Sequence, residues 1–181
     1  MPSEQDDNDL ITRFQRGDVT SFNGLVRRYQ EPVYQTARRL LGSHEDAQDL
    51  SQEVFIHAYK GLRQFRGEAG FSTWIYRIAV NLALNALRRR KLRQFFSLDH
   101  PGLTITAKSP TPDQLVEQKE LRSVIENAIE RLPAKQKIVF TLRYFQKLPH
   151  AEIAGILDRN VGTIKANYHQ ALRKLQKAVK S

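Results

Sequence analysis

Apolar residues recur at helical spacing along nearly the whole 181-residue chain, and this repeat constrains the fold more than any other feature of the sequence. Glycine and proline are almost absent from long tracts, and no alternating apolar pattern is long enough to predict a β-strand. The sequence therefore predicts an all-α fold. Helices are expected at residues 8–16, 19–41, 44–60, 71–95, 114–131, 135–146, 150–157 and 161–179.

One segment interrupts the helical repeat. Residues 97–112, SLDHPGLTITAKSPTP, hold three prolines and a glycine among hydroxyl residues, a composition typical of a linker. We therefore expect two small helical domains, residues 8–96 and residues 113–179, joined by a flexible linker. Fully extended, the linker reaches up to about 55 Å, which allows the two domains to sit far apart on one partner.

Residues 150–174, HAEIAGILDRNVGTIKANYHQALRK, predict a helix-turn-helix. Asp158, Arg159 and Asn160 form the expected turn. Asn160 is a good N-cap for the second helix, and Asp158 occupies the left-handed position that glycine often fills. The buried stripe of the two helices is expected at Ile153, Ala154, Leu157, Val161, Ile164, Tyr168 and Leu172.

The outer face of the second helix combines small residues with hydrogen-bonding and basic ones. Small residues admit close approach, while the longer side chains reach phosphates and base edges in a major groove. Duplex DNA is therefore the expected partner, although this stretch alone leaves open an ordinary helical hairpin with a solvated face. The face consists of Gly162, Thr163, Lys165, Ala166, His169, Gln170 and Arg173.

The net charge of +10 is divided unevenly along the chain. Residues 1–60 carry −3, whereas residues 61–96 carry +7 and residues 113–181 carry +6. Two separate basic regions indicate two contacts with a polyanion. The acidic portion indicates either a surface for a basic protein or a solvated face.

Composition argues against several function classes. The chain has no cysteine, which fits a reducing cytoplasm, and its five histidines lack metal-ligand spacing. No catalytic or phosphate-binding motif is present, so we expect neither an enzyme nor a metal or other cofactor. The acidic start lacks a secretory pattern and no window is apolar enough to cross a bilayer, so we expect a cytoplasmic protein without membrane insertion.

The helix expected at residues 44–60 has two distinct sides. Its core side is marked by Ala47, Leu50, Val54 and Ala58. The opposite side carries a largely acidic stripe, which is either a docking face or simply solvated. The stripe consists of Glu45, Asp49, Gln52 and Glu53.

Residues 61–93 lead from a loop rich in glycine and arginine into a helix that ends in a run of basic residues. Aromatic side chains beside cations suit unstacked bases, and polar side chains can read an exposed base edge. Phe65 and Tyr76 are the expected base contacts, because Phe71 and Trp74 fall on the apolar stripe. That stripe consists of Phe71, Trp74, Ile75, Ile78, Ala79, Leu82 and Ala86, and the open side is expected at Thr73, Tyr76, Arg77, Asn81, Asn85 and Arg88.

Taken in chain order, the acidic helix at 44–60, the basic loop and helix at 61–93 and the helix-turn-helix at 150–174 resemble the extracytoplasmic-function (ECF) group of bacterial sigma-70 factors. The resemblance covers about residues 8–178. The most specific stretches are DLSQEVFIHAYKGL at 49–62, FRGEAGFSTWIYRIAVN at 65–81 and VGTIKANYHQA at 161–171. The resemblance implies a protein that binds core RNA polymerase, directs it to promoters and helps to open the duplex. It implies sigma region 2 at 8–96 and sigma region 4 at 113–179.

The resemblance also implies partners and residue roles. The acidic stripe, with Asp49, Gln52 and Glu53 matching a D-x-x-Q-E pattern, would dock on the coiled coil of the polymerase clamp, and the polymerase flap is a further contact. Promoter DNA, both duplex and melted, and an anti-sigma factor are the other expected partners. The helix at 161–173 would read the −35 element. Residues assigned to the −10 element are Gly61, Phe65, Arg66, Tyr76, Arg77, Ile78, Asn81 and Arg88.

The sequence departs from the family pattern in the second helix of the helix-turn-helix. Many members have Ser-Arg at the positions of Ala166 and Asn167 and an aromatic residue at His169, so the preferred −35 sequence stays open. The alternative function is a one-component regulator whose N-terminal domain senses a signal or dimerises. It accounts for the helix-turn-helix but not for the second basic region or the acidic helix.

Overall fold

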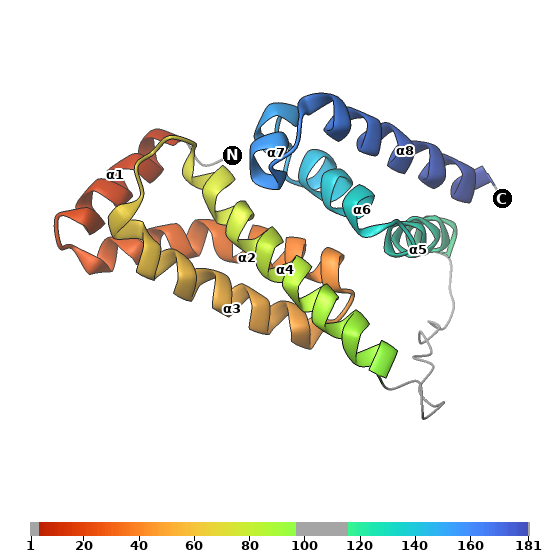
Figure 1. Ribbon diagram of the computed structural model, residues 1–181, viewed down its shortest axis with the longest axis horizontal. Coiled ribbons are helices and arrows are strands. Elements are labelled where there is room, and N and C mark those ends of the chain that lie inside the picture. The colour runs from red at the N-terminus through yellow and green to blue at the C-terminus, as the bar shows by residue number, and fades with distance from the viewer. Residues whose placement is uncertain (1–3, 97–115, 181) are drawn as a thin grey trace.

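A computed structural model of the chain describes residues 4–96 and 116–180, and within these ranges every element is a helix (Figure 1). The predicted all-α fold with two helical domains is confirmed. The linker expected at 97–112 lies outside the described residues. The N-terminal elements are α1 (Glu4–Gln15), η1 (Val19–Ser21), α2 (Phe22–Leu41), α3 (His44–Gly61), η2 (Leu62–Gln64) and α4 (Phe71–Phe96). The C-terminal elements are α5 (Val116–Glu130), α6 (Ala134–Phe140), η3 (Thr141–Phe145), α7 (His150–Leu157) and α8 (Val161–Lys180).

Helices α2, α3 and α4 pack against one another to form the N-terminal core. The turn between α2 and α3 needs only two residues. Gly42 ends α2 in the left-handed region at φ 77°, and the Ser43 hydroxyl caps α3 by accepting the Asp46 N–H at 3.2 Å. The predicted core side of α3 is correct, because all four of its residues are buried.

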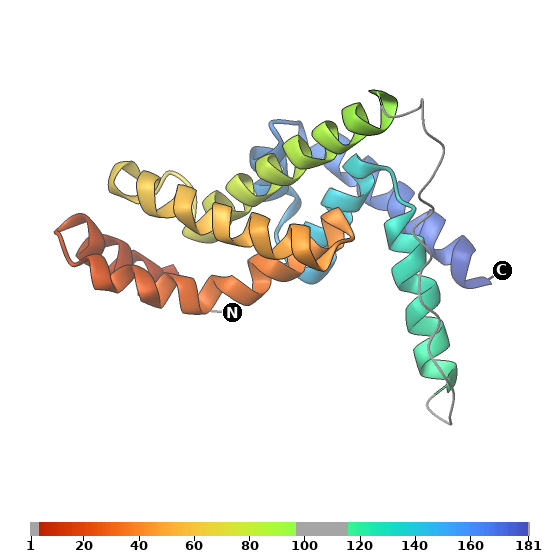
Figure 2. The same cartoon turned by 90° about the horizontal axis from the view of Figure 1, so that it is seen from below.

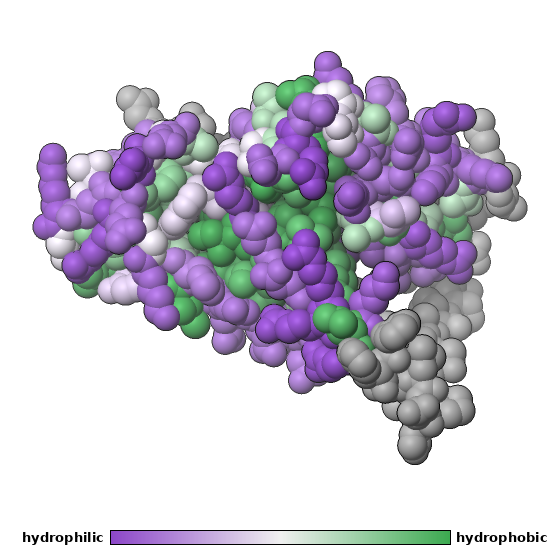
Figure 3. All heavy atoms as spheres, in the orientation of Figure 1, coloured by the Kyte–Doolittle hydropathy of each residue, from purple (hydrophilic) through white to green (hydrophobic). Residues whose placement is uncertain are grey.

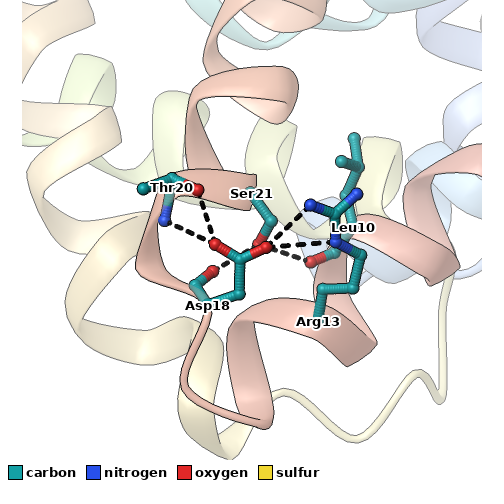
Figure 4. Close-up of polar contacts among 5 residues, drawn as sticks. All are labelled: Leu10, Arg13, Asp18, Thr20 and Ser21. Carbon is teal, nitrogen blue, oxygen red and sulfur yellow. Dashed lines mark hydrogen bonds and ion pairs between the residues drawn. The ribbon is translucent and has the colours of Figure 1, made fainter.

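A polar cluster sets the corner between α1 and α2 (Figure 4). The Asp18 carboxylate accepts hydrogen bonds from the Thr20 N–H at 3.1 Å and from the Arg13 guanidinium at 2.7 Å. The hydrogen bonds from Thr20 and Arg13 lower the pKa of Asp18. The Ser21 hydroxyl lies 2.9 Å from the Leu10 carbonyl oxygen, so the corner is tied back to α1.

A buried carboxylate attaches α1 to α2. Asp7 is 2% exposed and accepts hydrogen bonds from the Arg28 guanidinium at 2.8 Å and the Tyr29 hydroxyl at 2.5 Å. Burial, and then the hydrogen bond to Asp7, raise the pKa of Tyr29. The whole interaction keeps a neutral phenol and a paired carboxylate inside the N-terminal core.

The C-terminal core lies where α5 and α6 pack on α8. Its buried residues are Ile129, Leu132, Phe140, Ala171 and Leu175. Figure 2 shows α5 projecting away from the N-terminal helices. Within the described residues, no helix is long and apolar enough to cross a membrane.

The single helix expected at 135–146 is wrong in its last turn. Helix α6 ends at Phe140, and the chain continues as the π-helical turn η3. Lys147 then takes a left-handed conformation at φ 59°, and the Leu148 N–H donates to the Leu142 carbonyl at 3.2 Å. An apolar repeat does not distinguish a π-turn from an α-turn, which is why the sequence did not reveal this change of path.

The stripe predicted for α8 is buried at Ile164 and half-buried at Tyr168 and Leu172, but it is wrong at Val161. Val161 is 37% exposed because it lies at the first position of the helix, beside the turn. Farther along, the prediction missed Ala171, which is fully buried. The buried side is wider there because α8 packs on α5 and α6 as well as on α7.

The two domains touch. Helix α7 packs against α4 (Figure 1). The turn η3 packs against α2. Buried residues of both domains, including Tyr76 and Val80 of α4 and Ile153 and Ile156 of α7, belong to one continuous apolar cluster. Figure 3 shows hydrophobic residues gathered between α4 and α6, at the boundary of the two domains.

We predict that stability falls as the pH rises above about 10, the ordinary pKa of tyrosine. Above pH 10 the unfolded chain ionises its phenols, whereas the folded chain keeps the buried Tyr29 neutral. The stability that the neutral, buried phenol contributes is therefore complete below pH 10 and is lost as the pH rises above it. The slope from one such group is up to about 1.4 kcal/mol per pH unit. Urea unfolding followed by circular dichroism from pH 8 to 11 should give a shallower slope for Tyr29→Phe. An equal slope would contradict the assignment.

Candidate functional site

The acidic stripe of α3 is open to solvent. Glu45, Asp49, Gln52 and Glu53 are all exposed, on the side opposite the buried residues that anchor α3 to α2 and α4. His57 lies one turn beyond, with its Nε2 atom 3.8 Å from Glu53 Oε1. The structure therefore brings the four predicted residues together as one face on a rigid helix.

A groove of about 560 Å³ runs beside this face, between α3 and the C-terminal part of α4. One wall carries Asp46, Asp49 and Glu53, and its floor is apolar. The other wall carries arginines from the basic run of α4, which lies about forty positions away in the sequence. That wall consists of Arg89, Arg90 and Arg93, and the floor of Leu41, Leu50, Leu82, Ala86 and Leu87. Sequence reasoning assigned the basic region at residues 61–96 to contact with a polyanion and missed that these arginines face the acidic helix.

Three aromatic rings cluster where the loop enters α4. The Phe65 ring centroid lies 5.0 Å from that of Trp74 and 6.2 Å from that of Phe71. A Cβ atom on Gly61 would lie 3.1 Å from Trp74 Cζ2, so glycine lets the indole approach the end of α3. Phe65 and Gly61, both half-buried, thus share one neighbour, Trp74.

The rest of the predicted −10 set lies along α4. Arg77, Asn81 and Arg88 are exposed, and Ile78 is half-buried. Spacings of three and four residues place Trp74, Ile78 and Asn81 on one stripe, so the aromatic cluster continues into a polar position. Arg66 is exposed in the loop that precedes the helix.

The open side expected for α4 is wrong at Thr73 and Tyr76. Thr73 is 3% exposed and Tyr76 is 4% exposed, because the C-terminal domain covers them. The Tyr76 hydroxyl donates to Gln146 Oε1 at 2.7 Å, and burial raises the pKa of this phenol. In this arrangement Tyr76 offers no surface to a base.

The helix-turn-helix turn has the predicted chemistry. Asp158 adopts φ 50° and ψ 57°, the left-handed conformation. Asn160 Oδ1 accepts the Thr163 N–H at 2.7 Å and so caps α8. The cap satisfies one of the free N–H groups at the start of the helix and fixes the angle at which α8 leaves the turn.

The outer face of α8 is available. Gly162, Lys165, Ala166, His169, Gln170 and Arg173 are exposed, and Thr163 is half-buried. Figure 3 shows that hydrophilic residues cover α8 on the side in view. The structure therefore brings the seven predicted residues onto one side of one helix.

Two neighbours of this face were missed. Gln136 of α6 is 8% exposed, and its Nε2 donates to Gln170 Oε1 at 2.7 Å, which fixes the Gln170 amide. No sequence signal links two residues on separate helices. His150 packs on Tyr168, and burial, with Arg143 and Lys165 nearby, lowers its pKa.

Comparisons with known proteins identify related sequences that span both helical domains. The family model for Sigma-70 region 2 matches residues 25–93, and the model for Sigma-70 region 4 matches residues 122–175. The ECF RNA polymerase sigma factor SigW of Bacillus subtilis is 34% identical over 177 residues, covering 94% of this chain and 95% of SigW. The ECF RNA polymerase sigma-E factor of Escherichia coli K12 is 36% identical over 178 residues, covering 94% and 93%.

A solved structure shares the fold. It contains the sigma factor RpoE in complex with the anti-sigma factor NepR, from Bartonella quintana. The TM-score is 0.72 with 21% sequence identity, over 88% of this chain and 96% of that one.

We predict that Asn160→Ala lowers the free energy of unfolding by about 1 kcal/mol, because the Thr163 N–H loses its acceptor. Asn160→Asp is the matched control and should retain most of the stability, since aspartate caps equally well. Thermal denaturation followed by circular dichroism at 222 nm measures both. Equal melting temperatures for Asn160→Ala and the parent chain would show that the cap does not stabilise α8.

Proposed function

The chain belongs to the ECF group of the sigma-70 family of RNA polymerase sigma factors and directs transcription initiation, and from this premise we propose how its surfaces divide the work. The domain of residues 8–96 binds core polymerase and reads and melts the −10 element. The domain of residues 113–179 reads the −35 element. The protein acts in the bacterial cytoplasm and has no enzymatic activity of its own.

The observation that carries the proposal is the exposed acidic face of α3. It accompanies two surfaces of the kind that bind DNA, one on α4 and the loop before it and one on α8. Four polar residues, three of them carboxylates, stand on a helix whose opposite side is fully buried. Such a face complements a basic protein element, here the coiled coil of the polymerase clamp. A one-component DNA-binding regulator has no need of this third surface.

The −10 element is held by α4 and the loop before it. Arg66, Arg77 and Arg88 are exposed cations that can pair with phosphates on the melted strand. The Asn81 amide, one turn beyond Ile78, carries both a donor and an acceptor for a base edge. The aromatic cluster of Phe65 and Trp74 supplies an apolar wall for a base that has left the stack.

The −35 element is read from the major groove by α8. The helix has 20 residues and is about 30 Å long at 1.5 Å per residue, so only its first turns reach base edges. Lys165 and His169 lie in those turns and are assigned to bases. Arg173 lies farther along and is assigned to phosphate, while Gln136 fixes the amide of Gln170 toward the same groove.

Two further partners are proposed for this chain. RpoE of Bartonella quintana has been solved with an anti-sigma factor, and the shared fold supports an anti-sigma factor as a partner here. The C-terminal domain is proposed to contact the polymerase flap.

The proposed function is tested by reconstitution with core RNA polymerase, followed by sequencing of transcript 5′ ends. Factor-dependent transcripts that share −35 and −10 motifs upstream are the expected result. Binding to DNA without binding to core polymerase, and no factor-dependent transcripts, would instead support a one-component regulator.

We predict that Asp49→Arg weakens binding to core polymerase at least tenfold without loss of folding. The residue is exposed, so the change costs little stability, but it reverses a charge in the docking face. Asp9→Arg is the matched control, because Asp9 is exposed on α1, outside that face and outside the C-terminal domain. Binding is measured by fluorescence titration with labelled sigma factor. If both variants bind as tightly as the parent, α3 is not the docking face.

We predict different effects for two basic residues of α8. Arg173→Ala should weaken all promoters alike and reduce the slope of log affinity against log salt by about one, the effect of losing one phosphate contact. Lys165→Ala should instead flatten preference at one or two −35 positions. Holoenzyme binding across salt concentrations and a set of −35 variants measures both. Equal weakening of every variant by Lys165→Ala would make Lys165 a phosphate contact.

A further inference from the structure

A buried glutamine of α6 contacts the outer face of α8. Gln136 is 8% exposed, and its Nε2 donates to Gln170 Oε1 at 2.7 Å, although the two residues lie 34 positions apart in the sequence. Gln170 itself is exposed and belongs to the face that we assign to the −35 element. The hydrogen bond therefore links the interior of the C-terminal domain to a side chain of the proposed DNA-reading surface.

The packing of α6 on α8 holds the donor in place. Phe140 lies one turn beyond Gln136 on α6, and its ring stacks on that of Tyr168 with 6.1 Å between the centroids. Ala171, which follows Gln170, is fully buried in the same core cluster as Phe140, so the two helices approach closely at this point. Gln136 therefore projects from a fixed position, whereas the exposed Gln170 can rotate to meet it.

Only one half of the Gln136 amide is paired. Its Oε1 atom is buried and accepts no hydrogen bond from the residues that the structure describes. A buried carbonyl oxygen without a donor costs stability, and an apolar side chain of the same length would avoid that cost. The packing of the core therefore does not explain a glutamine at this position, but its contact with Gln170 does.

The unpaired oxygen also decides which way round the two amides lie. If both were turned over, the NH2 group of Gln136 would take the buried position that has no partner. Buried N–H groups without an acceptor are rarer than under-satisfied carbonyl oxygens. Gln136 therefore donates and Gln170 Oε1 accepts, so Gln170 Nε2, on the other side of the same amide carbon, is directed away from Gln136.

A donor held in this way discriminates among bases. In the major groove guanine presents two neighbouring acceptors, N7 and O6, whereas adenine presents the N7 acceptor beside the N6 donor. A glutamine that turns freely pairs with adenine through both halves of its amide. A glutamine whose oxygen is held by another residue meets the base with its NH2 group, which suits the two acceptors of guanine and leaves the adenine N6 group without a partner.

We propose that Gln136 is a positioning residue for −35 recognition, which holds Gln170 as a hydrogen-bond donor and so gives it a preference for guanine over adenine. Gln136 touches no base itself and acts through the amide of Gln170. The inference rests on the proposed function, which places α8 in the −35 groove. It adds the kind of base edge that Gln170 reads and the buried residue that sets this choice.

The test uses holoenzyme reconstituted from core polymerase and the full chain. Promoter fragments, taken from the transcript 5′ ends, carry all four bases at each −35 position, and the bound fragments are sequenced. The parent should favour guanine over adenine about fivefold at one position, the effect of one neutral hydrogen bond. Gln170→Ala should lose the preference there and at no other position. Equal weakening of every fragment by Gln170→Ala would place its amide on a phosphate and overturn the proposal.

Two substitutions of Gln136 separate positioning from packing. Gln136→Met keeps the length of the side chain but has no donor, so the ratio of guanine to adenine should fall to about one, because a freely turning Gln170 also pairs with adenine. Gln136→Glu introduces a carboxylate that only accepts, so the Gln170 amide should turn over and the preference should change from guanine to adenine. A packing defect does not reverse a base preference.

Gln176→Met is the matched control, because it makes the same change at an exposed position of α8 and should keep the parent's preference. Unchanged preference in both Gln136→Met and Gln136→Glu would overturn the proposal. A further change of preference when Gln136→Met is added to Gln170→Ala would also overturn it, because Gln136 would then act without Gln170.

The same selection separates this inference from the proposed function. Fragments bound without preference at any −35 position would show that α8 does not read this element, and the proposed function would fail together with the inference. A clear −35 preference that neither substitution of Gln136 changes would leave the proposed function standing and remove only the positioning role.

Discussion

The structure depends on one helix, α4, being covered on two sides. Ile75 and Ala79 are buried in the core that α4 forms with α2 and α3, and Tyr76 is buried by the C-terminal domain. A helix covered in this way leaves only a narrow stripe for any other partner. Arg77, Asn81 and Arg88 occupy that stripe, so the path that we propose for a bound strand along α4 is restricted by packing as much as by the polar residues themselves.

Opposite charges lie on separate elements, and this separation supports the contacts that we propose for one small chain, with a protein and with a polyanion. The carboxylates of α3 and the arginines at the end of α4 meet only across the groove that α3 and α4 form. Across the groove each row of charge partly screens the other, while the outer face of α3 stays exposed to the basic partner proposed for it. The outer face of α8, with Lys165 and Arg173 exposed, is the cationic surface that we propose for DNA.

Much of this arrangement can be read from local sequence. The two sides of α3 follow from a repeat of 3.6 residues, and the turn at Asp158 and Asn160 follows from the backbone preferences of those two residue types. The position of Tyr76 does not, because it depends on Gln146, seventy positions away and in another domain. A stripe of polar residues on a helix predicts exposure only where no second domain packs on that stripe. The same limit applies to Gln136 and Gln170, whose contact joins two helices with no shared pattern.

The central claim is that the exposed face of α3 is the surface that this sigma factor offers to core polymerase, and site-specific cross-linking tests it most directly. The chain has no cysteine, so Gln52→Cys on α3 and Gln176→Cys on α8, both at exposed positions, allow a photo-activated cross-linker to be attached specifically. With core polymerase, cross-links from position 52 should map to the clamp coiled coil, and those from position 176 should map elsewhere. Cross-links from position 52 that map outside the clamp, or that do not form, would contradict the account.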